Sequence, residues 1–324
     1  MDVQSTIKGT KGNSAKTPKD ARKAFSTLGL GCVVFFLVGS ILQVVLGECF
    51  PELSSTEWGT WVFMCVPTYV VAFPLSLLVF RLVPVRGGAG GGKLEPGWIL
   101  RAFMIMFILK NAGNVVGILV KNVLSIIAGV SAEADAGSYM VSDAMLFKLL
   151  FMAIVGPLVE EVIFRKVLID RMRCYGGKLA VVTTALMFGL FHGNFSQFFY
   201  STAVGLLYGY IYLKTGKLRY SAGLHMAMNF LGVIEAYLFV LISNSEVVST
   251  QLVVLALIFI LMLLEVAGSI AGLVFFLRCR KKVSYDTAEF ELPKGSRLRT
   301  VWLNVGMILF ILCCLVMFVT SLLS

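Results

Sequence analysis

Residues 249–278, STQLVVLALIFILMLLEVAGSIAGLVFFLR, indicate the class of fold because only Glu265 and Arg278 in this run are charged. A transmembrane helix needs about 20 mostly apolar residues, and this run is longer. Apolar runs recur along the whole chain, which is 58% hydrophobic with a mean hydropathy of +0.88. We count nine candidate spans, at residues 25–47, 58–81, 98–130, 144–174, 178–195, 197–213, 220–242, 249–278 and 301–323. The sequence therefore predicts an all-α, polytopic transmembrane helical bundle of about eight or nine spans.

The segments at 178–195 and 197–213 are both short, and almost nothing separates them. A tight hairpin that does not fully span the bilayer is the alternative for this pair.

The net charge of +10 follows the predicted topology. Lysine and arginine gather in alternate connecting segments, at residues 8–23, 81–93, 165–178, 214–219 and 278–282. The intervening loops contain acidic side chains and no Lys or Arg: Glu48, Glu52, Glu57, Glu133, Asp135 and Glu246. Positive charge marks the cytoplasmic side, so the pattern predicts a cytoplasmic N-terminus in a multi-pass cell-membrane protein, with a bacterial plasma membrane favoured. Because topology accounts for the charge, we expect no nucleic acid as a partner.

The composition divides the chain into four parts. Residues 1–24 are polar and basic, which predicts a disordered cytoplasmic tail. Residues 25–143 are predicted N-terminal transmembrane helices, interrupted by a glycine-rich linker at 87–92. Residues 144–242 hold most of the unusual polar side chains and form the expected functional core. Residues 243–324 complete the chain as C-terminal transmembrane helices.

The segment GPLVEEVIFR, residues 156–165, places two adjacent glutamates inside an apolar span. Ionisable groups within a membrane are functional candidates. Glu161 and Arg165 are four residues apart, the spacing at which helical side chains meet, so we pair them as structural support. Successive helical residues point about 100° apart, which leaves Glu160 free to face a polar cavity. A buried ion pair without a catalytic role is the alternative for Glu161 and Arg165.

The only two histidines of the chain, His192 and His225, also lie in apolar segments. His192 ends the motif FGLFH, where the small Gly189 permits another helix to approach closely. His225 and Asn229, in the motif HMAMN, are four residues apart and share one helix face. The two polar groups suit the wall of a site; an interhelical hydrogen bond is the alternative and explains Asn229 better than His225.

Together these motifs resemble the CAAX protease and bacteriocin-processing family, also called the Abi family, which includes the type II CAAX prenyl endopeptidases. The order and spacing of EEVIFR, FGLFH and HMAMN carry the resemblance, together with GLLYGY at 205–210. The resemblance implies an intramembrane endopeptidase of the glutamate type. Glu160 and His192 would then activate the attacking water, while His225 and Asn229 would stabilise the oxyanion. This chain departs from the family pattern at Lys166, where glycine is common.

Three questions stay open at the level of sequence. No cofactor is favoured, but a zinc ion at Glu160, His192 and His225 would satisfy the usual count of three protein ligands. A non-catalytic immunity or scaffold protein that retains the fold is the alternative function. A transporter is a third class, suggested by polar residues in the third span: Lys110, Asn111, Asn114 and Lys121. These four could equally line a protease cavity or snorkel from helix ends. The resemblance implies a peptide or protein substrate at the membrane, either prenylated or a leader peptide.

Overall fold

Helices make up all the regular structure in the part of the chain that is described. The computed structural model describes residues 17–86, 90–130, 147–285 and 287–323, and no strand occurs among them. The longer helices and α7 are α1 (Pro18–Cys49), α3 (Glu57–Cys65), α4 (Phe73–Arg81), α5 (Pro96–Ala128), α7 (Gly156–Glu161), α9 (Gly177–Phe191), α10 (Phe195–Thr215), α11 (Leu218–Asn244), α12 (Val248–Cys279) and α14 (Val305–Leu323). The shorter elements are α2 (Pro51–Ser54), η1 (Val66–Ala72), η3 (Lys148–Val155), η4 (Val162–Ile169), α8 (Asp170–Met172), η5 (Arg173–Tyr175), η6 (Arg280–Lys282), η7 (Lys294–Ser296) and α13 (Arg297–Val301). The all-α prediction is confirmed.

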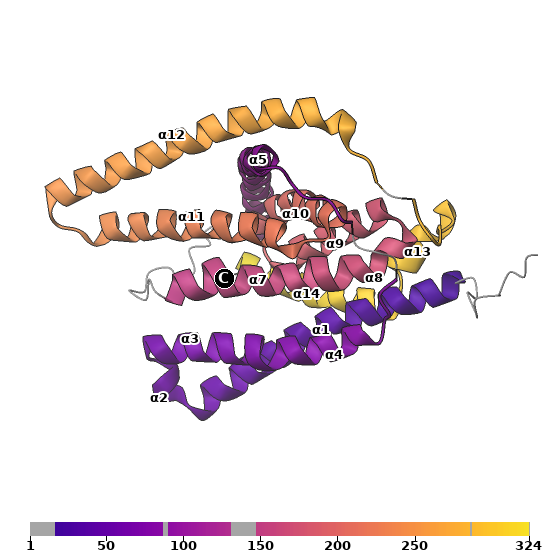
Figure 1. The fold of residues 1–324 in the computed structure, drawn as a ribbon. Helices are drawn as coiled ribbons and strands as arrows, with labels where there is room; N and C mark the ends of the chain where they lie inside the picture. The colour runs from indigo at the N-terminus through magenta and orange to yellow at the C-terminus, as the bar shows by residue number, and fades with distance from the viewer. Residues whose placement is uncertain (1–16, 87–89, 131–146, 286, 324) are drawn as a thin grey trace, which may run out of the picture.

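The helices are arranged around α7. Figure 1 shows α3 and α4 on one side of α7 and α11 on the other, with α5 and α12 beyond α11. Helices α9 and α10 pack against each other and against the helix that contains α7. The segment around Glu160 therefore has protein on several sides.

The first helix begins earlier than the sequence predicted. Thr17 and Asp20 form a capping box: the Thr17 hydroxyl accepts the Asp20 N–H, and the Asp20 carboxylate accepts the Thr17 N–H. Pro18 suits the first helical turn, and Ala21 is fully buried. Residues 18–24 are therefore helical, so the predicted disordered tail of 1–24 is wrong there, while residues 1–16 lie outside the described part.

The first and last long helices, α1 and α14, pack against each other. A Cβ at Gly29 would lie 2.5 Å from the Gly306 carbonyl carbon, closer than real Cβ atoms approach other atoms. The Gly306 N–H also donates to the Ser26 hydroxyl at 2.9 Å. Small residues allow this close approach between helices, as is common in membrane proteins.

One nearly continuous helix runs from Lys148 to Met172, and its type changes along its length. The stretches η3 and η4, on either side of α7, are π-helical. At the first junction the Gly156 N–H donates to the Phe151 carbonyl, five residues earlier. These π-helical turns were not predicted from the sequence, and such turns often occur at functional sites.

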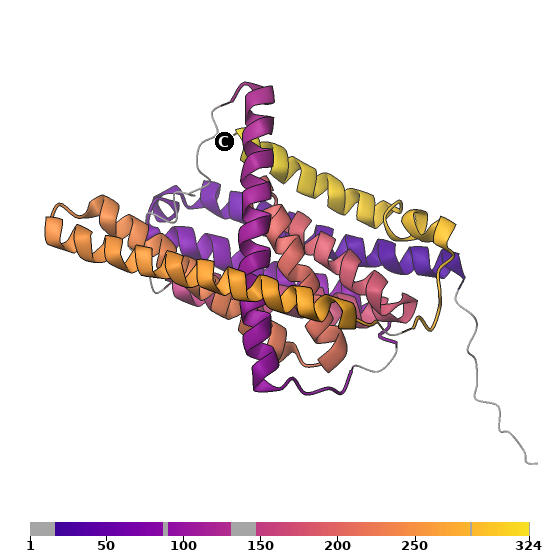
Figure 2. The same ribbon diagram turned by 90° about the horizontal axis from the view of Figure 1, so that it is seen from above.

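Helix α5 runs across α11 and α12 rather than alongside them (Figure 2). It contacts α10 through two glycines one turn apart. A Cβ at Gly113 would lie 2.3 Å from the Tyr200 Cα. A Cβ at Gly117 would lie 2.6 Å from the Phe195 carbonyl oxygen. On another side, a Cβ at Gly272 of α12 would lie 2.0 Å from the Met104 carbonyl oxygen. These glycines allow α5 to pack closely between α10 and α12.

Six helices in the described part are long and apolar enough to cross a membrane: Pro18–Cys49, Trp58–Arg81, Pro96–Ala128, Leu218–Asn244, Val248–Lys282 and Val305–Leu323. They correspond to six of the nine predicted spans. The predicted span 144–174 is the helix from Lys148 to Met172, and the pair at 178–195 and 197–213 is the helical hairpin of α9 and α10. The count of spans and the cytoplasmic N-terminus stay predictions.

Candidate active site

A cavity of about 620 Å³ lies beside α7. Its volume is within the range of ligand pockets, roughly 300–1,000 Å³. Four residues singled out by sequence line it together: Glu160, His192, His225 and Asn229. They come from α7, the end of α9, and α11, so the fold brings three separate motifs to one cavity.

The two adjacent glutamates have different surroundings. Glu160 lines the cavity with its side chain 24% exposed, whereas the Glu161 side chain is fully buried. The Arg165 Nη2 lies 3.1 Å from the Glu161 Oε1, and the Arg165 side chain is also fully buried. The guanidinium lies against the rings of Phe188 and Tyr208, at 4.9 and 5.8 Å from their centroids. The predicted pairing of Glu161 with Arg165 is therefore present, and Glu160 faces the cavity.

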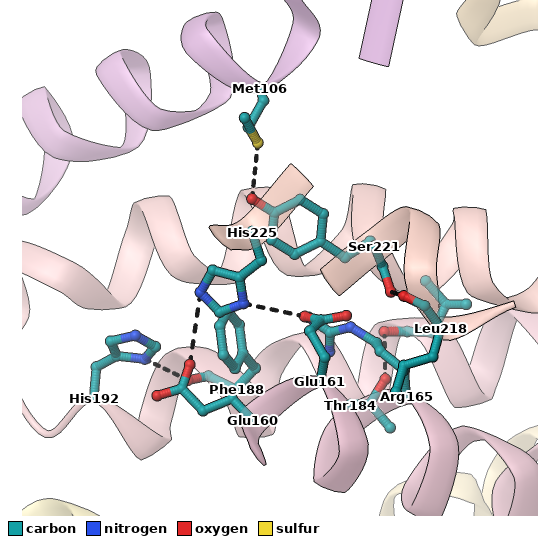
Figure 3. A network of polar contacts seen from close by, with 12 residues as sticks. Met106, Glu160, Glu161, Arg165, Thr184, Phe188, His192, Leu218, Ser221 and His225 are labelled. Atoms are coloured by element: carbon teal, nitrogen blue, oxygen red, sulfur yellow. Dashed lines mark hydrogen bonds and ion pairs between the residues drawn. The ribbon is translucent and has the colours of Figure 1, made fainter. Parts of the chain in front are cut away.

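His225 lies between the two glutamates (Figure 3). Its Nδ1 is 3.3 Å from the Glu161 Oε1, and its Nε2 is 3.7 Å from the Glu160 Oε2. The ring stacks on Tyr208 and meets the edge of Phe188. The sequence did not predict this contact between the first and third motifs, because they are more than sixty residues apart.

His192 has one ring nitrogen committed to the backbone. Its Nδ1 is 2.8 Å from the Phe188 carbonyl oxygen. A carbonyl only accepts, so this contact requires the proton on Nδ1 and leaves Nε2 with a lone pair in the neutral ring. A Cβ at Gly189 would lie 2.0 Å from the Thr202 Oγ1 and 2.8 Å from the Phe198 carbonyl oxygen, which confirms the predicted close approach of another helix there.

The chain turns sharply directly after His192. Gly193 has a φ of +66°, in the left-handed region that favours glycine. The Asn194 side chain then caps α10 by accepting the Gln197 N–H at 2.8 Å. This tight turn fixes His192 at the tip of the hairpin formed by α9 and α10.

Asn229 makes the interhelical hydrogen bond that was the alternative explanation for it. Its Nδ2 donates to the Met152 carbonyl oxygen in η3 at 2.9 Å. Asn229 also lines the cavity, and an amide group has two N–H donors, so this bond leaves the second available.

Comparison with known proteins adds to this geometry. Residues 142–231 match the family model described as "Type II CAAX prenyl endopeptidase Rce1-like". The core of this chain resembles type II CAAX prenyl endopeptidases. The chain is also 26% identical over 173 residues to a Bacillus subtilis (strain 168) protein named "Putative membrane peptidase YdiL", covering 53% of this chain and 69% of that protein. No solved structure gives a significant match. The predicted family resemblance is confirmed, and both matches indicate a membrane peptidase.

The cavity of this endopeptidase-like core is completed by helices outside the matched region. Trp61, Met64, Thr68 and Tyr69 line it from α3 and η1. They were missed from sequence, although their spacing of three, four and one residues places them near one face of a helix. The helical spacing of these residues could have been seen in the sequence, but the spacing within one helix does not show which part of the protein that face contacts.

The polar residues of the third predicted span divide between two environments. Lys110 and Asn114 line the cavity, as one of the predicted alternatives had it. Asn111 instead donates its Nδ2 to the Ser269 hydroxyl of α12 at 3.0 Å.

A metal site was tested against the geometry of these side chains. Among the described residues, no group of three or more His, Cys, Asp or Glu side chains is placed to hold a metal ion. The His225 Nε2 faces the Glu160 carboxylate at 3.7 Å, and its Nδ1 faces Glu161. His192 does not join Glu160 and His225 in a group of three possible metal ligands, so the predicted zinc site is not formed among the described residues, and we assign no step to a metal.

Proposed function

We propose that this protein is an intramembrane endopeptidase that hydrolyses peptide bonds of membrane-associated proteins or peptides with water activated by Glu160 and His192. The observation that carries the proposal is the placement of Glu160, His192 and His225 around one cavity. The buried Glu161–Arg165 pair lies next to His225, through Glu161. The motifs occupy the segment that resembles the type II CAAX prenyl endopeptidases.

The attack step uses the two groups that can take a proton from water. The Glu160 carboxylate and the unprotonated Nε2 of His192 both suit this role. The water oxygen forms a bond to the substrate carbonyl carbon, and its proton passes to Glu160. The carbonyl π electrons move to the oxygen, which becomes an oxyanion.

The oxyanion needs donors, and α11 provides two at the cavity. His225 can donate from a protonated Nε2, and Asn229 has the amide N–H that Met152 does not use. The intermediate then collapses, the C–N bond breaks, and Glu160 returns the proton to the leaving amine. Glu161 and Arg165 would hold His225 from behind and contact no substrate.

The proposal extends to location and domain organisation. The six apolar helices suit a multi-pass membrane protein, and we place it in the cell membrane. Residues 144–242 would be the protease core, and the helices of 25–143 and 243–324 would enclose it, because residues at 61–69 and at 110 and 114 line the same cavity. Prenylated proteins and leader peptides are the two substrate classes we propose.

A comparison of peptide termini tests the function. Cells that carry wild-type protein and cells that carry Glu160→Gln would be compared by mass spectrometry of protein and peptide termini. Glu160→Gln keeps the shape of the side chain but removes the base, so we expect the product termini to disappear while protein yield stays unchanged. Glu246→Gln is the matched control, because Glu246 is exposed between α11 and α12.

Identical termini in wild-type and Glu160→Gln cells at matched expression would contradict the protease and favour the non-catalytic immunity or scaffold protein. Cleavage that persists in purified Glu160→Gln protein would reject the role of Glu160 specifically.

A further inference from the structure

A cluster of three charged side chains lies at the edge of the cavity, where α5, α11 and α12 meet. The Lys110 Nζ of α5 hydrogen-bonds to the Glu265 carboxylate of α12. The same Nζ is 3.9 Å from the Glu235 Oε2 of α11. Charged lysine and glutamate side chains are costly to place within a membrane, so they are functional candidates when they occur there.

The three side chains face different spaces. Lys110 is part of the cavity wall that also contains Glu160 and His192. Glu235 and Glu265 instead line a smaller hollow of about 100 Å³ between α11 and α12. Lys110 is therefore the member of the cluster that lines the cavity, and its ammonium contacts the two carboxylates of the neighbouring hollow.

The surroundings keep the ammonium in place. Opposite charges within about 4–6 Å favour the charged form of a lysine. The Asn111–Ser269 hydrogen bond joins α5 to α12 beside Lys110, and Gly272 allows the two helices to touch. Glu265 is the closer partner of Lys110, whereas Glu235 is farther away and, at 30% exposed, the more accessible carboxylate. An incoming anion can therefore replace Glu235 beside the ammonium while Glu265 still holds it.

We propose that Lys110 binds a carboxylate of the peptide substrate and thereby positions the scissile bond at Glu160. The carboxylate is either the free C-terminus or an acidic side chain, and both would meet the ammonium in the same way. Lys110 is provided by α5, and the aromatic wall of Trp61 by α3, on the opposite side of α7 and α11 (Figure 1). A peptide bound across the cavity would thus place its carboxylate at Lys110 and apolar groups at Trp61. This inference rests on the proposed function for identifying the cavity as the substrate site.

A binding experiment tests Lys110 without requiring hydrolysis. Full-length Glu160→Gln protein in detergent would be incubated with a pool of random hexapeptides, prepared once as free acids and once as C-terminal amides. Retained peptides would be identified by mass spectrometry. We expect free acids, or peptides that contain Asp or Glu, to be enriched about tenfold or more among the retained peptides relative to their share of the starting pool. A charge-assisted hydrogen bond can provide a preference of this size. The amide pool shows which of the two carboxylates is bound.

Variants of Lys110 in the same Glu160→Gln protein give the decisive comparison. Lys110→Met should bring the enrichment close to one, and Lys110→Arg should retain most of it. Lys110→Met leaves two glutamates without a cation, so the neutral variant Lys110→Met/Glu235→Gln/Glu265→Gln is included in case the single variant does not fold. Lys93→Met is the matched control, because Lys93 is exposed just before α5.

Enrichment of carboxylates that depends on Lys110 supports the inference, whichever carboxylate is the source. Equal retention of acids and amides with no preference for Asp or Glu, unchanged enrichment in the Lys110 variants, a preference for basic peptides, or no retained peptide would each overturn it. Loss of the proposed function appears separately, as product termini that do not depend on Glu160.

Discussion

At the scale of single residues, the adjacent Glu160 and Glu161 have different surroundings and different expected roles. Glu161 is enclosed with Arg165 and His225, whereas Glu160 faces the cavity. The roughly 100° between successive helical side chains produces the difference. A buried carboxylate needs its partners, so we expect Glu161 to act on stability first and on chemistry only through His225.

The buried pair gives a prediction about stability. Arg165→Ala should destabilise the protein by about 3–5 kcal/mol, because it leaves the Glu161 charge buried without its partner. The measurement is thermal unfolding in detergent, together with membrane yield. Lys166→Ala is the neighbouring control: Lys166 is 58% exposed and pairs with Asp170 at 3.0 Å, and such pairs contribute at most about 1 kcal/mol. Equal losses in both variants would contradict the structural role of Arg165.

Asn229 allows its two roles to be separated. Asn229→Ala removes the bond to Met152, which should cost stability by only about 0.6–1.7 kcal/mol. If Asn229 also donates to the oxyanion, kcat on a cleaved peptide should fall about 10²- to 10³-fold. Both are measured on the same purified protein. A stability loss with unchanged kcat would reduce Asn229 to an interhelical contact.

At the scale of elements, close contacts at glycines determine where the helices touch. Gly189 brings α10 against the end of α9, and Gly193 then turns the chain beside His192. The π-helical turns of η3 and η4 flank α7 and its glutamates. The position of His192 therefore depends on the packing of the α9–α10 hairpin.

That dependence predicts the effect of one methyl group. Gly189→Ala should destabilise the protein by about 1–3 kcal/mol, because the new Cβ would meet the backbone of Phe198 and the Thr202 hydroxyl. It should also lower activity by displacing His192. Thermal unfolding and cleavage rate measure both effects. Gly223→Ala in α11 is the matched control, since a Cβ there meets nothing within 4 Å and should be neutral or slightly stabilising. Equal behaviour of the two variants would contradict the close contact.

At the scale of the whole molecule, the cavity joins parts that are distant in sequence. The segment that resembles the endopeptidases contains the four proposed catalytic residues, while α3, η1 and α5 contribute Trp61, Tyr69 and Lys110 to the same wall. Substrate preference should therefore depend on helices outside that segment.

The predicted orientation can be checked with cysteines already in the chain. Cys49 ends α1 and is exposed, and a cytoplasmic N-terminus places it outside the cell. Cys279 ends α12, among the basic residues expected on the cytoplasmic side. A membrane-impermeant maleimide added to intact cells should label a variant that keeps only Cys49. A variant that keeps only Cys279 should react only after permeabilisation. The reverse pattern would invert the predicted topology.

The sequence by itself determined the helical class, most of the helix positions, the candidate site residues and the Glu161–Arg165 pair. Apolar length and the spacing of three or four residues along one helix are local properties, so they can be predicted without knowing the neighbours. Only the tertiary structure placed His225 between two glutamates, bound Asn229 to Met152, and brought Trp61 and Lys110 to the cavity. These contacts depend on which helix faces meet, and in a membrane that choice depends on close packing and single hydrogen bonds rather than on hydrophobicity.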